Sequence, residues 1–282
     1  MQVGIFYMPT TYTADVVTLA RRVEELGFES LWVPDHPIMP VERTSPFPGG
    51  GEMPASYAHL MDPLVTLAAA AGATERIRLG TGIVLAAERE PLVLAKEVST
   101  LDLVSNGRFE FGVGAGWQRE EAEILGVHWK RRWAHVREHV LAMKACWRDG
   151  LAEFHGEYVD FPPVWSDPKP VQRPHPPILI AGELARAPER IVEYGDGWIP
   201  RFVRVTPEEV AVTRRRIEAM YGEAGRDFSR FRITMFGSHP DPETHRRLED
   251  AGVDRVLQVL RVSPEEDALA RVETWAERLL AA

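Results

Sequence analysis

The sequence predicts an α/β protein folded as one (β/α)8 TIM barrel that spans residues 1–282. Short apolar β-rich runs alternate with longer segments of helical period, and this alternation is typical of parallel strands joined by helices. Eight such pairs follow one another, and their strands are too apolar to face water. Both observations favour a closed barrel. A doubly wound open sheet is the alternative, although that fold usually has fewer strands for this length.

The first four units occupy the N-terminal half. Helix 14–27 places Leu19, Val23 and other apolar residues on one face, and Gly27 ends it because glycine adopts the left-handed cap conformation at low cost. The third helix has Pro91 in its first turn and closes at Asn106-Gly107. The predicted strands are 2–8, 30–34, 77–85 and 108–114, and the other helical segments are 63–74 and 118–149.

The last four units follow the same order at closer spacing. Their predicted strands are 177–182, 197–200, 231–237 and 253–259, and their helices are 184–194, 206–224, 241–251 and 264–280. Two insertions interrupt the alternation. One runs from Asp35 to Asp62 after the second strand, and the other, before the fifth strand, combines an alternating segment (154–161) with a proline-rich strap (167–177). Long loops in a compact domain are usually functional lids, and ornament on the barrel is the alternative.

Composition excludes several classes of protein. The net charge of -9 and the lack of a basic block argue against a nucleic-acid-binding protein. No apolar run reaches about 18 residues, so no membrane span is predicted. The N-terminus has no basic leader, and a cytoplasmic protein is therefore expected. The single cysteine, Cys146, excludes an intrachain disulfide and a cysteine-cluster metal site.

Barrel enzymes carry their sites at the C-terminal strand ends. No His-x-His pair follows the first strand, the lysines lie on helices or loops, and only Asp35 and Glu183 could supply paired carboxylates. These absences disfavour a metal-dependent hydrolase, a Schiff-base enzyme and a retaining glycosidase. The strand ends are instead glycine-rich and aromatic. Because glycine lets backbone approach a ring system closely, a large planar cofactor is expected and no metal site is predicted.

Two strand ends resemble phosphate-binding turns. The segment GVGAGW (112–117) is similar to a dinucleotide fingerprint, but its glycine spacing differs and three βα units precede it. Packing of a crowded strand end is the alternative there. The segment 181–185 turns from a strand into a helix, whose free amides would favour a phosphate. An ordinary capped helix start is the alternative.

Together these segments resemble the luciferase-like monooxygenase superfamily, and within it the coenzyme F420-dependent oxidoreductases. The similarity extends through nearly the whole chain. It is carried by VGIFYMPT at the N-terminus, ELGFESLWVPDH (25–36), the long segment 76–127, KPVQRPHPPILIAGE (169–183) and YGDGWIP (194–200).

The resemblance implies roles for individual residues. His36 is expected to be a general acid or to polarise the reacting group, with Asp35 orienting it or bonding the cofactor; capping and packing of a loop start is the alternative for this pair. Thr81, Gly82 and Ile83 match a bulge behind the cofactor ring, with a cis peptide expected at Gly82–Ile83. The remaining cofactor-binding residues would be Gly114, Ala115, Gly116 and Trp117 along the side chain of the cofactor, and Ala181, Gly182, Glu183 and Leu184 at its phosphate.

The chain departs from the family pattern at Glu183, where a serine or asparagine usually follows two glycines. The expected reaction is hydride transfer between F420 and a small organic substrate. An FMN-dependent monooxygenase and a non-catalytic cofactor-binding barrel are the alternatives. Since no nucleotide-binding second domain is recognisable, a separate enzyme is expected to reduce the cofactor. The resemblance also implies a homodimer. The lid 37–61, with Met39, Phe47, Met53 and Tyr57, suggests an apolar or aromatic-tolerant pocket.

Overall fold

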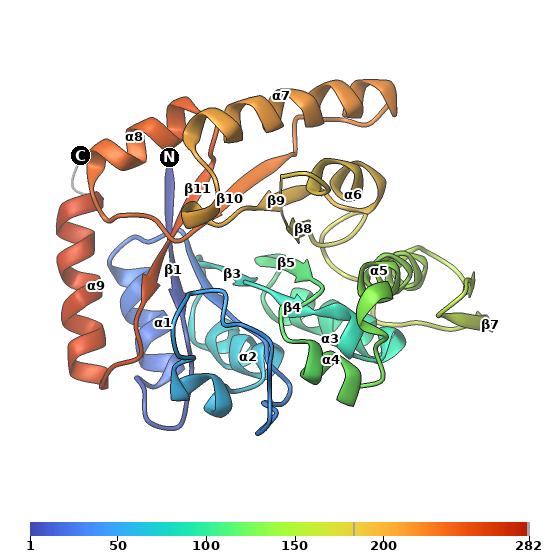
Figure 1. The fold of residues 1–282 in the computed structure, drawn as a ribbon, viewed down its shortest axis with the longest axis horizontal. Helices are drawn as coiled ribbons and strands as arrows, with labels where there is room; N and C mark the ends of the chain where they lie inside the picture. Colours follow the sequence, from blue (N-terminus) through green and yellow to red (C-terminus); the bar gives the residue numbers. More distant parts are fainter. Residues whose placement is uncertain (183, 281–282) are drawn as a thin grey trace.

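The computed structural model of the protein describes residues 1–182 and 184–280. Within them, parallel strands close in the order β1–β2–β3–β5–β8–β9–β10–β11, and β11 pairs back with β1 (Figure 1). These strands are β1 (Gln2–Tyr7), β2 (Ser30–Val33), β3 (Arg78–Thr81), β5 (Phe109–Gly114), β8 (Ile178–Ala181), β9 (Gly197–Ile199), β10 (Arg232–Phe236) and β11 (Arg255–Leu260). The predicted barrel is confirmed.

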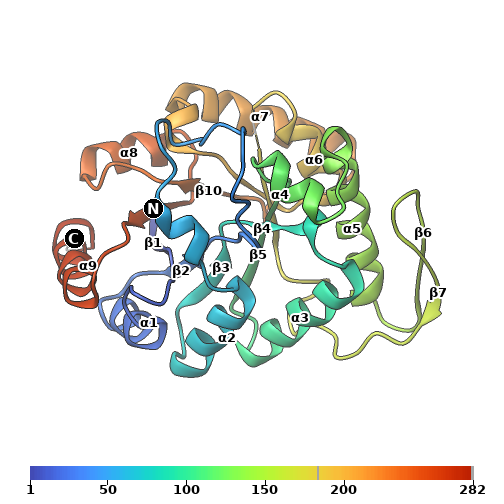
Figure 2. The ribbon, with the colours of Figure 1, turned by 60° about the horizontal axis from the view of Figure 1, so that its bottom comes forward.

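The helices surround the strands as an outer layer (Figure 2). They are α1 (Val16–Glu25), α2 (Pro63–Ala73), α3 (Pro91–Val104), α4 (Arg119–Ile124), α5 (Arg132–Trp147), α6 (Ala187–Tyr194), α7 (Pro207–Glu223), α8 (Pro242–Asp250) and α9 (Glu265–Leu279). No helix in the described part of the chain is long and apolar enough to cross a membrane.

Three segments differ from the sequence prediction. The predicted helix 118–149 is divided into α4 and α5, because Gly126 takes a φ of 82° directly after α4. The segment 154–161 belongs to an antiparallel hairpin of β6 (Ala152–His155) and β7 (Asp160–Val164), which stands outside α5 (Figures 1 and 2). The helix predicted from 184 begins at Ala187.

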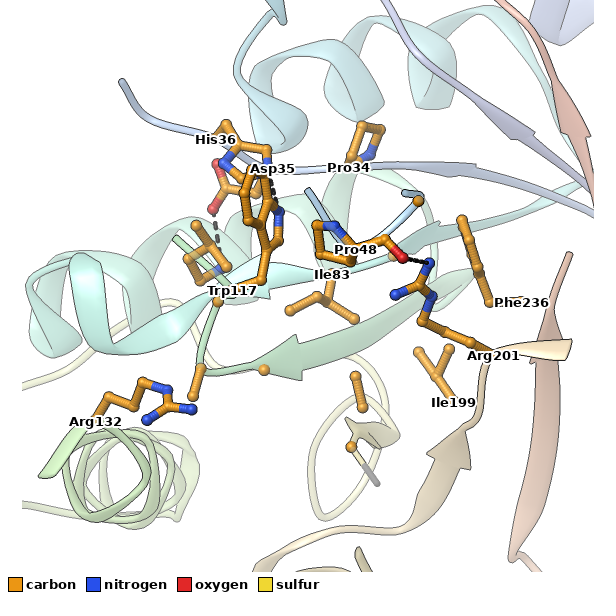
Figure 3. Close-up of a pocket in the computed structure, with 18 of the residues that line it drawn as sticks. Pro34, Asp35, His36, Pro48, Ile83, Trp117, Arg132, Ile199, Arg201 and Phe236 are labelled. Atoms are coloured by element: carbon orange, nitrogen blue, oxygen red, sulfur yellow. Dashed lines mark hydrogen bonds between the residues drawn. The ribbon is translucent and has the colours of Figure 1, made fainter. Parts of the chain in front are cut away.

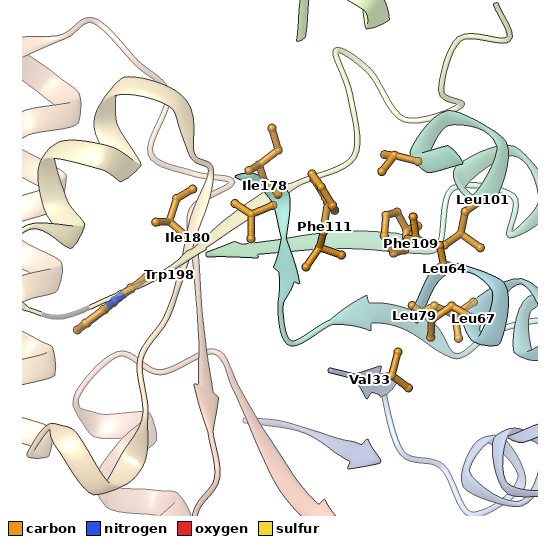
Figure 4. Close-up of a cluster of buried hydrophobic side chains, with 14 of the residues drawn as sticks. Val33, Leu64, Leu67, Leu79, Leu101, Phe109, Phe111, Ile178, Ile180 and Trp198 are labelled. Carbon is orange, nitrogen blue, oxygen red and sulfur yellow. The ribbon is translucent and has the colours of Figure 1, made fainter. Parts of the chain in front are cut away.

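Alternation along the strands separates two apolar cores. One face of each strand points outward, where strand residues including Phe109, Phe111 and Ile178 pack against helix residues such as Leu64 (Figure 4). Neighbouring residues point into the barrel and form a separate interior cluster, composed of Phe6, Trp32, Leu179, Ile199 and Leu257. This is the period of two expected for strands buried on both faces.

The interior accommodates Trp32 because glycine faces it. A Cβ atom built on Gly80 would lie 2.4 Å from the Trp32 ring, so any other residue at 80 would force this buried ring to move. Below this layer, at the N-terminal ends of the strands, Arg255 donates to Glu29 and Glu110 at 2.6 and 2.7 Å. Charged side chains thus fill the lower barrel, and the upper interior is apolar and open to a cavity.

Candidate active site

A cavity of about 530 Å³ opens at the C-terminal ends of the barrel strands (Figure 3). Its volume lies in the range of small-molecule and cofactor sites. Residues at or directly after the C-terminal ends of seven barrel strands line it, together with part of the loop 37–61 and residues of α5 and α6. Among them are Phe6, Met8, Pro34, Asp35, His36, Phe47, Tyr57, Gly82, Ile83, Gly114, Ala115, Gly116, Trp117, Ala181, Gly182, Ile199, Arg201 and Phe236.

His36 is held at both ring nitrogens. Its Nδ1 atom lies 2.7 Å from Glu121 Oε2, and its Nε2 atom lies 3.2 Å from the Trp117 indole nitrogen. Because an indole N–H can only donate, Nε2 must be the acceptor. The proton of the neutral ring is therefore on Nδ1 and is donated to Glu121. Only 6% of the His36 side chain is exposed, so the tautomer is set by these two partners.

Glu121, which the sequence analysis missed, is the carboxylate behind His36. It lies on α4 with a side chain that is 0% exposed. Burial raises the pKa of Glu121, against the lowering effect of its hydrogen bond with His36. The signal in the sequence was the acidic pair that opens a helix directly after the GAGW turn. A carboxylate at Nδ1 stabilises an imidazolium, which equips His36 to exchange a proton at Nε2.

Asp35 contacts other partners. Its carboxylate accepts from Arg89 at 2.8 and 3.0 Å and from the Leu85 amide at 3.1 Å. Arg89 also donates to Asp62, the residue that caps α2. Asp35 lines the cavity, but its hydrogen bonds connect the end of β2 to the segment after β3. The orienting contact to His36 comes from Glu121 instead.

The segment between β3 and β4 (Val84–Leu85) contains the expected bulge. The Gly82–Ile83 peptide is cis, as predicted, and both residues line the cavity. Thr81 lies behind this wall, fully buried, with its hydroxyl donated to the Gly112 carbonyl at 2.8 Å. On the neighbouring strand end, Gly114, Ala115, Gly116 and Trp117 line the cavity as a group. Gly116 adopts a φ of 70°, which favours glycine there.

A buried acid lies beneath this turn. A Cβ atom on Gly116 would be 3.1 Å from Glu88 Oε1, and neither carboxyl oxygen of Glu88 has a hydrogen-bond partner among the described residues. Burial, with the nearby carboxylates Glu121 and Asp35, raises the pKa of Glu88 to about 9. Glu88 is therefore a neutral acid at pH 7, and it adds no negative charge beside the His36–Glu121 pair.

The loop 37–61 covers one side of the cavity with aromatic rings. Phe47 and Tyr57 pack edge-on against each other and against Trp117, with ring centroids 5.2–6.4 Å apart. Tyr57 also packs against His36 at 5.5 Å. Glu120 fixes the same loop to α4, because its carboxylate accepts from the amides and hydroxyls of Thr44 and Ser45.

The end of β8 carries positive charge. Ala181 and Gly182 line the cavity, and so do Arg132, Arg186 and Arg190. The Arg190 guanidinium stacks on the Trp133 ring at 3.6 Å, and burial together with the neighbouring arginines lowers the pKa of Arg190. The sequence analysis missed these arginines. Leu184, predicted at the phosphate, packs against the hydrophobic core instead, and Glu183 lies outside the described residues.

Sequence comparison places this chain among known families. A family model described as luciferase-like monooxygenase matches residues 1–240. An uncharacterized protein of Mycobacterium tuberculosis is 37% identical over 266 residues, which is 92% of each chain. An F420-dependent glucose-6-phosphate dehydrogenase of Amycolatopsis mediterranei is 31% identical over 66% of this chain and 52% of its own length. The oxygenase component of a flavin-dependent trigonelline monooxygenase of Acinetobacter baylyi is 29% identical over 68% and 48%.

Solved structures share the barrel. Monooxygenase RslO1 from Streptomyces bottropensis superposes with a TM-score of 0.79 at 23% identity, over 99% of both chains. An F420-dependent secondary alcohol dehydrogenase, solved with an F420-acetone adduct, superposes with a TM-score of 0.75 at 19% identity, over 99% of this chain and 98% of its own. At these identities the likeness establishes the fold.

Proposed function

The chain belongs to the luciferase-like monooxygenase family, and from that premise we propose that it is an F420-dependent oxidoreductase acting on a small organic substrate. Its family consists of oxidoreductases and monooxygenases. The observation that carries the proposal is one cavity that joins a proton-exchanging pair, His36 and Glu121, to a cluster of arginines.

The cavity fits a deazaflavin or flavin. Backbone at Gly82 and Gly116 forms part of its wall, and apolar side chains such as Ile83 and Ile199 form another part. A flat ring system needs such walls. The phosphate of either cofactor would lie beside Arg186 and Arg190, which supply the positive charge that the strand end at 181–182 lacks. In this role the arginines replace the serine or asparagine of the usual family pattern.

F420, when bound, supplies a carbon centre that gives or takes a hydride. The protein's part is proton exchange and positioning. When the substrate loses a hydride from a carbon bearing a hydroxyl, His36 Nε2 accepts the hydroxyl proton, and the Glu121 carboxylate stabilises the imidazolium that forms. In the reverse direction His36 returns the proton. In this structure the Trp117 indole N–H donates a hydrogen bond to Nε2, and this bond must break before the substrate hydroxyl can bind there.

The trigonelline monooxygenase relative favours a second candidate, an FMN-dependent monooxygenase that receives reduced flavin from a partner reductase. Both candidates use the same walls and the same arginines. They differ in the cofactor that the cavity accepts.

Titration of the purified protein with F420 and with FMN, followed by cofactor fluorescence, tests the proposal. We expect F420 to bind more tightly than FMN. Tighter FMN binding would favour the monooxygenase, and binding of neither would overturn both candidates. Arg190→Met is the matched variant for the phosphate site: it should weaken FMN about tenfold and leave riboflavin, which has no phosphate, unchanged. Equal losses for both flavins would contradict the phosphate assignment.

We also propose that the protein forms a homodimer through α2 and α3. Apolar side chains are exposed on these helices, namely Val65, Val93, Leu103 and Val104, at 50–71%. Light scattering should give twice the chain mass, and Val93→Glu should produce a monomer. Val212→Glu, on an exposed position of α7, is the control and should leave the mass unchanged.

A further inference from the structure

Arg201 follows β9 and lines the cavity on the side of the loop 37–61 (Figure 3). Its guanidinium is half-buried. In Figure 3 its side chain lies between Ile199, Phe236 and the Pro48 carbonyl. The hydrogen bond to that carbonyl measures 3.4 Å, which is long for a charged donor. Arg201 therefore brings a cation into an apolar part of the cavity.

Two other arginines of the barrel have carboxylate partners. Arg255 contacts Glu29 and Glu110. Arg89 contacts Asp35 and a second acid at the start of α2. For Arg201, no carboxylate of residues 1–182 and 184–280 lies within 4.0 Å. Removing a cation from water without an opposite charge is unfavourable, and burial with the neighbouring Arg204 lowers the pKa of Arg201.

The surroundings of Arg201 point to the kind of anion that would pair with it. Ile199, Phe236 and Phe6 form apolar walls of the same cavity. Arg204 is exposed and reaches the same Pro48 carbonyl, so it adds only a solvated charge. One half-buried guanidinium among apolar walls suits a single negative charge carried by an apolar body.

The site of proton exchange lies within reach of the same ligand. Tyr57 is the link, because its ring packs against His36 with centroids 5.5 Å apart, and Arg201 is near enough to oppose the rise that burial causes in the pKa of Tyr57. A substrate that places its reacting carbon at His36 can therefore extend past Tyr57 toward Arg201.

We propose that Arg201 binds a carboxylate of the substrate, so that the enzyme acts on small organic acids with an apolar or aromatic body. The carboxylate would accept hydrogen bonds from the guanidinium. This inference deepens the proposed function, because it assigns a substrate class to the same cavity. The arginines after β8 would hold the cofactor phosphate, and Arg201, at the loop side, would hold the substrate.

Binding of matched acids and amides to the full chain tests this assignment. The probes are benzoate, phenylacetate and hexanoate, each paired with its amide, and dissociation constants are measured by calorimetry. At least one acid should bind about tenfold more tightly than its amide, since only the carboxylate can accept charge-assisted hydrogen bonds as an anion. Arg201→Met should abolish the preference, and Arg201→Lys should keep part of it.

Two arginine variants are the controls. Arg204→Met removes an exposed guanidinium that contacts the same carbonyl, and Arg190→Met removes one from the β8 side; both should keep the acid preference. The proposal is overturned if no acid binds better than its amide, or if the preference survives Arg201→Met. It is also overturned if Arg190→Met, and not Arg201→Met, removes the preference, since the acids would then occupy the phosphate site.

A parallel F420 titration of the wild type and Arg201→Met separates this inference from the proposed function. The two proteins should bind F420 equally within about twofold. If neither binds F420 while the acid preference still depends on Arg201, the cofactor proposal fails and the anion site stands. If Arg201→Met loses F420 binding as strongly as acid binding, Arg201 belongs to the cofactor site and the inference fails.

Discussion

His36, Glu121 and Trp117 form the unit on which the proposed chemistry depends. Glu121 is a positioning residue, because it acts on the substrate through His36. His36→Asn should lower kcat by about 10²–10⁴-fold, the usual contribution of a general acid or base. Glu121→Gln should lower kcat at least tenfold and leave KM and the F420 dissociation constant unchanged, because the amide keeps the ring oriented but cannot stabilise an imidazolium.

Stopped-flow measurement of F420 reduction, with an alcohol or acid that the wild type oxidises, gives these constants. An unchanged kcat in His36→Asn would remove His36 from the mechanism. A Glu121→Gln protein with a raised KM as well as a lowered kcat would show that Glu121 maintains the shape of the cavity and does not act in proton transfer.

Glu88 makes the stability of the protein depend on pH. Its pKa is raised from 4.5 to about 9, so the folded state holds the proton more tightly than the unfolded state. A raised carboxyl pKa gives no penalty below pH 4.5 and destabilises the fold increasingly as the pH rises toward 9. Glu88→Gln keeps the shape and removes the ionisation. At pH 8 the variant should be about 4–5 kcal/mol more stable than the wild type, at about 1.36 kcal/mol per pH unit above 4.5.

Urea unfolding at pH 4.5 and pH 8, without cofactor, measures this difference in unfolding free energy. The two proteins should be equally stable at the lower pH. An advantage of the same size at both pH values would mean that packing, and not ionisation, separates them.

Sequence reasoning located some of these residues and missed others for a physical reason. Asp35 and His36 follow a strand directly, so the rule for barrel sites selects them. Glu121 reaches His36 from a helix that folds back over the strand end, a contact that no local pattern encodes. Arg190 was missed because it lies inside α6, and the rule for barrel sites selects strand ends and the loops after them.

At the scale of elements, the loop 37–61 is held to α4 by one carboxylate. Glu120 accepts from Thr44 and Ser45, and these contacts lower the pKa of Glu120 to about 2. Glu120→Ala should release the loop and speed tryptic cleavage after the exposed Arg43 several-fold, since cleavage follows local opening. Glu123→Ala, which removes an ion pair with Arg119 within the same helix, is the control.

Limited proteolysis followed by mass spectrometry gives both rates. Equal cleavage in Glu120→Ala and the wild type would mean that the aromatic contacts of Phe47 and Tyr57 hold the loop without Glu120. Acidification offers a second measurement. Because the pKa of Glu120 is lowered, the contribution of this contact is complete above about pH 4.5 and is lost as the pH falls toward 2.

The elements themselves were predictable where the periodicity was strong. Every predicted strand of the barrel is present, because a strand buried on both faces must be apolar along its length. The predicted helix 118–149 was too long because its helical period continues through the sequence on both sides of Gly126. The chain turns there because Gly126 adopts a φ of 82° after α4, and α5 then packs against α3.

At the scale of the whole molecule, the lower barrel depends on Arg255. It contacts Glu110, whose pKa is lowered to about 2 chiefly by Arg255 acting against burial. Arg255→Met would leave Glu110 buried with only Arg78 beside it, so the unfolding free energy should fall by about 3–5 kcal/mol. Arg232→Met is the control, since its exposed side chain donates to the backbone carbonyls of Ser229 and Phe231, and it should change stability by less than about 0.5 kcal/mol.

Urea unfolding at pH 7 and pH 3 measures both variants. In the wild type the contribution of Glu110 is complete above pH 4.5 and is lost as the pH falls through about 2. Arg255→Met should therefore lose less stability on acidification than the wild type. An Arg255→Met protein as stable as the control at pH 7 would show that the ion pair with Arg78 alone compensates for burying the Glu110 carboxylate.

Closure of the barrel has a consequence for how the chain folds. Residues Gln2 to Tyr7 pair in register with Arg255 to Leu260, so the two strands furthest apart in the sequence lie side by side. During synthesis, the apolar first strand leaves the ribosome long before its final neighbour exists, and one of its edges stays open. Such an edge recruits other chains, and contacts between distant segments form slowly. We therefore expect the yield of native protein to depend on chaperones and on slow synthesis more than on the stability of the finished barrel.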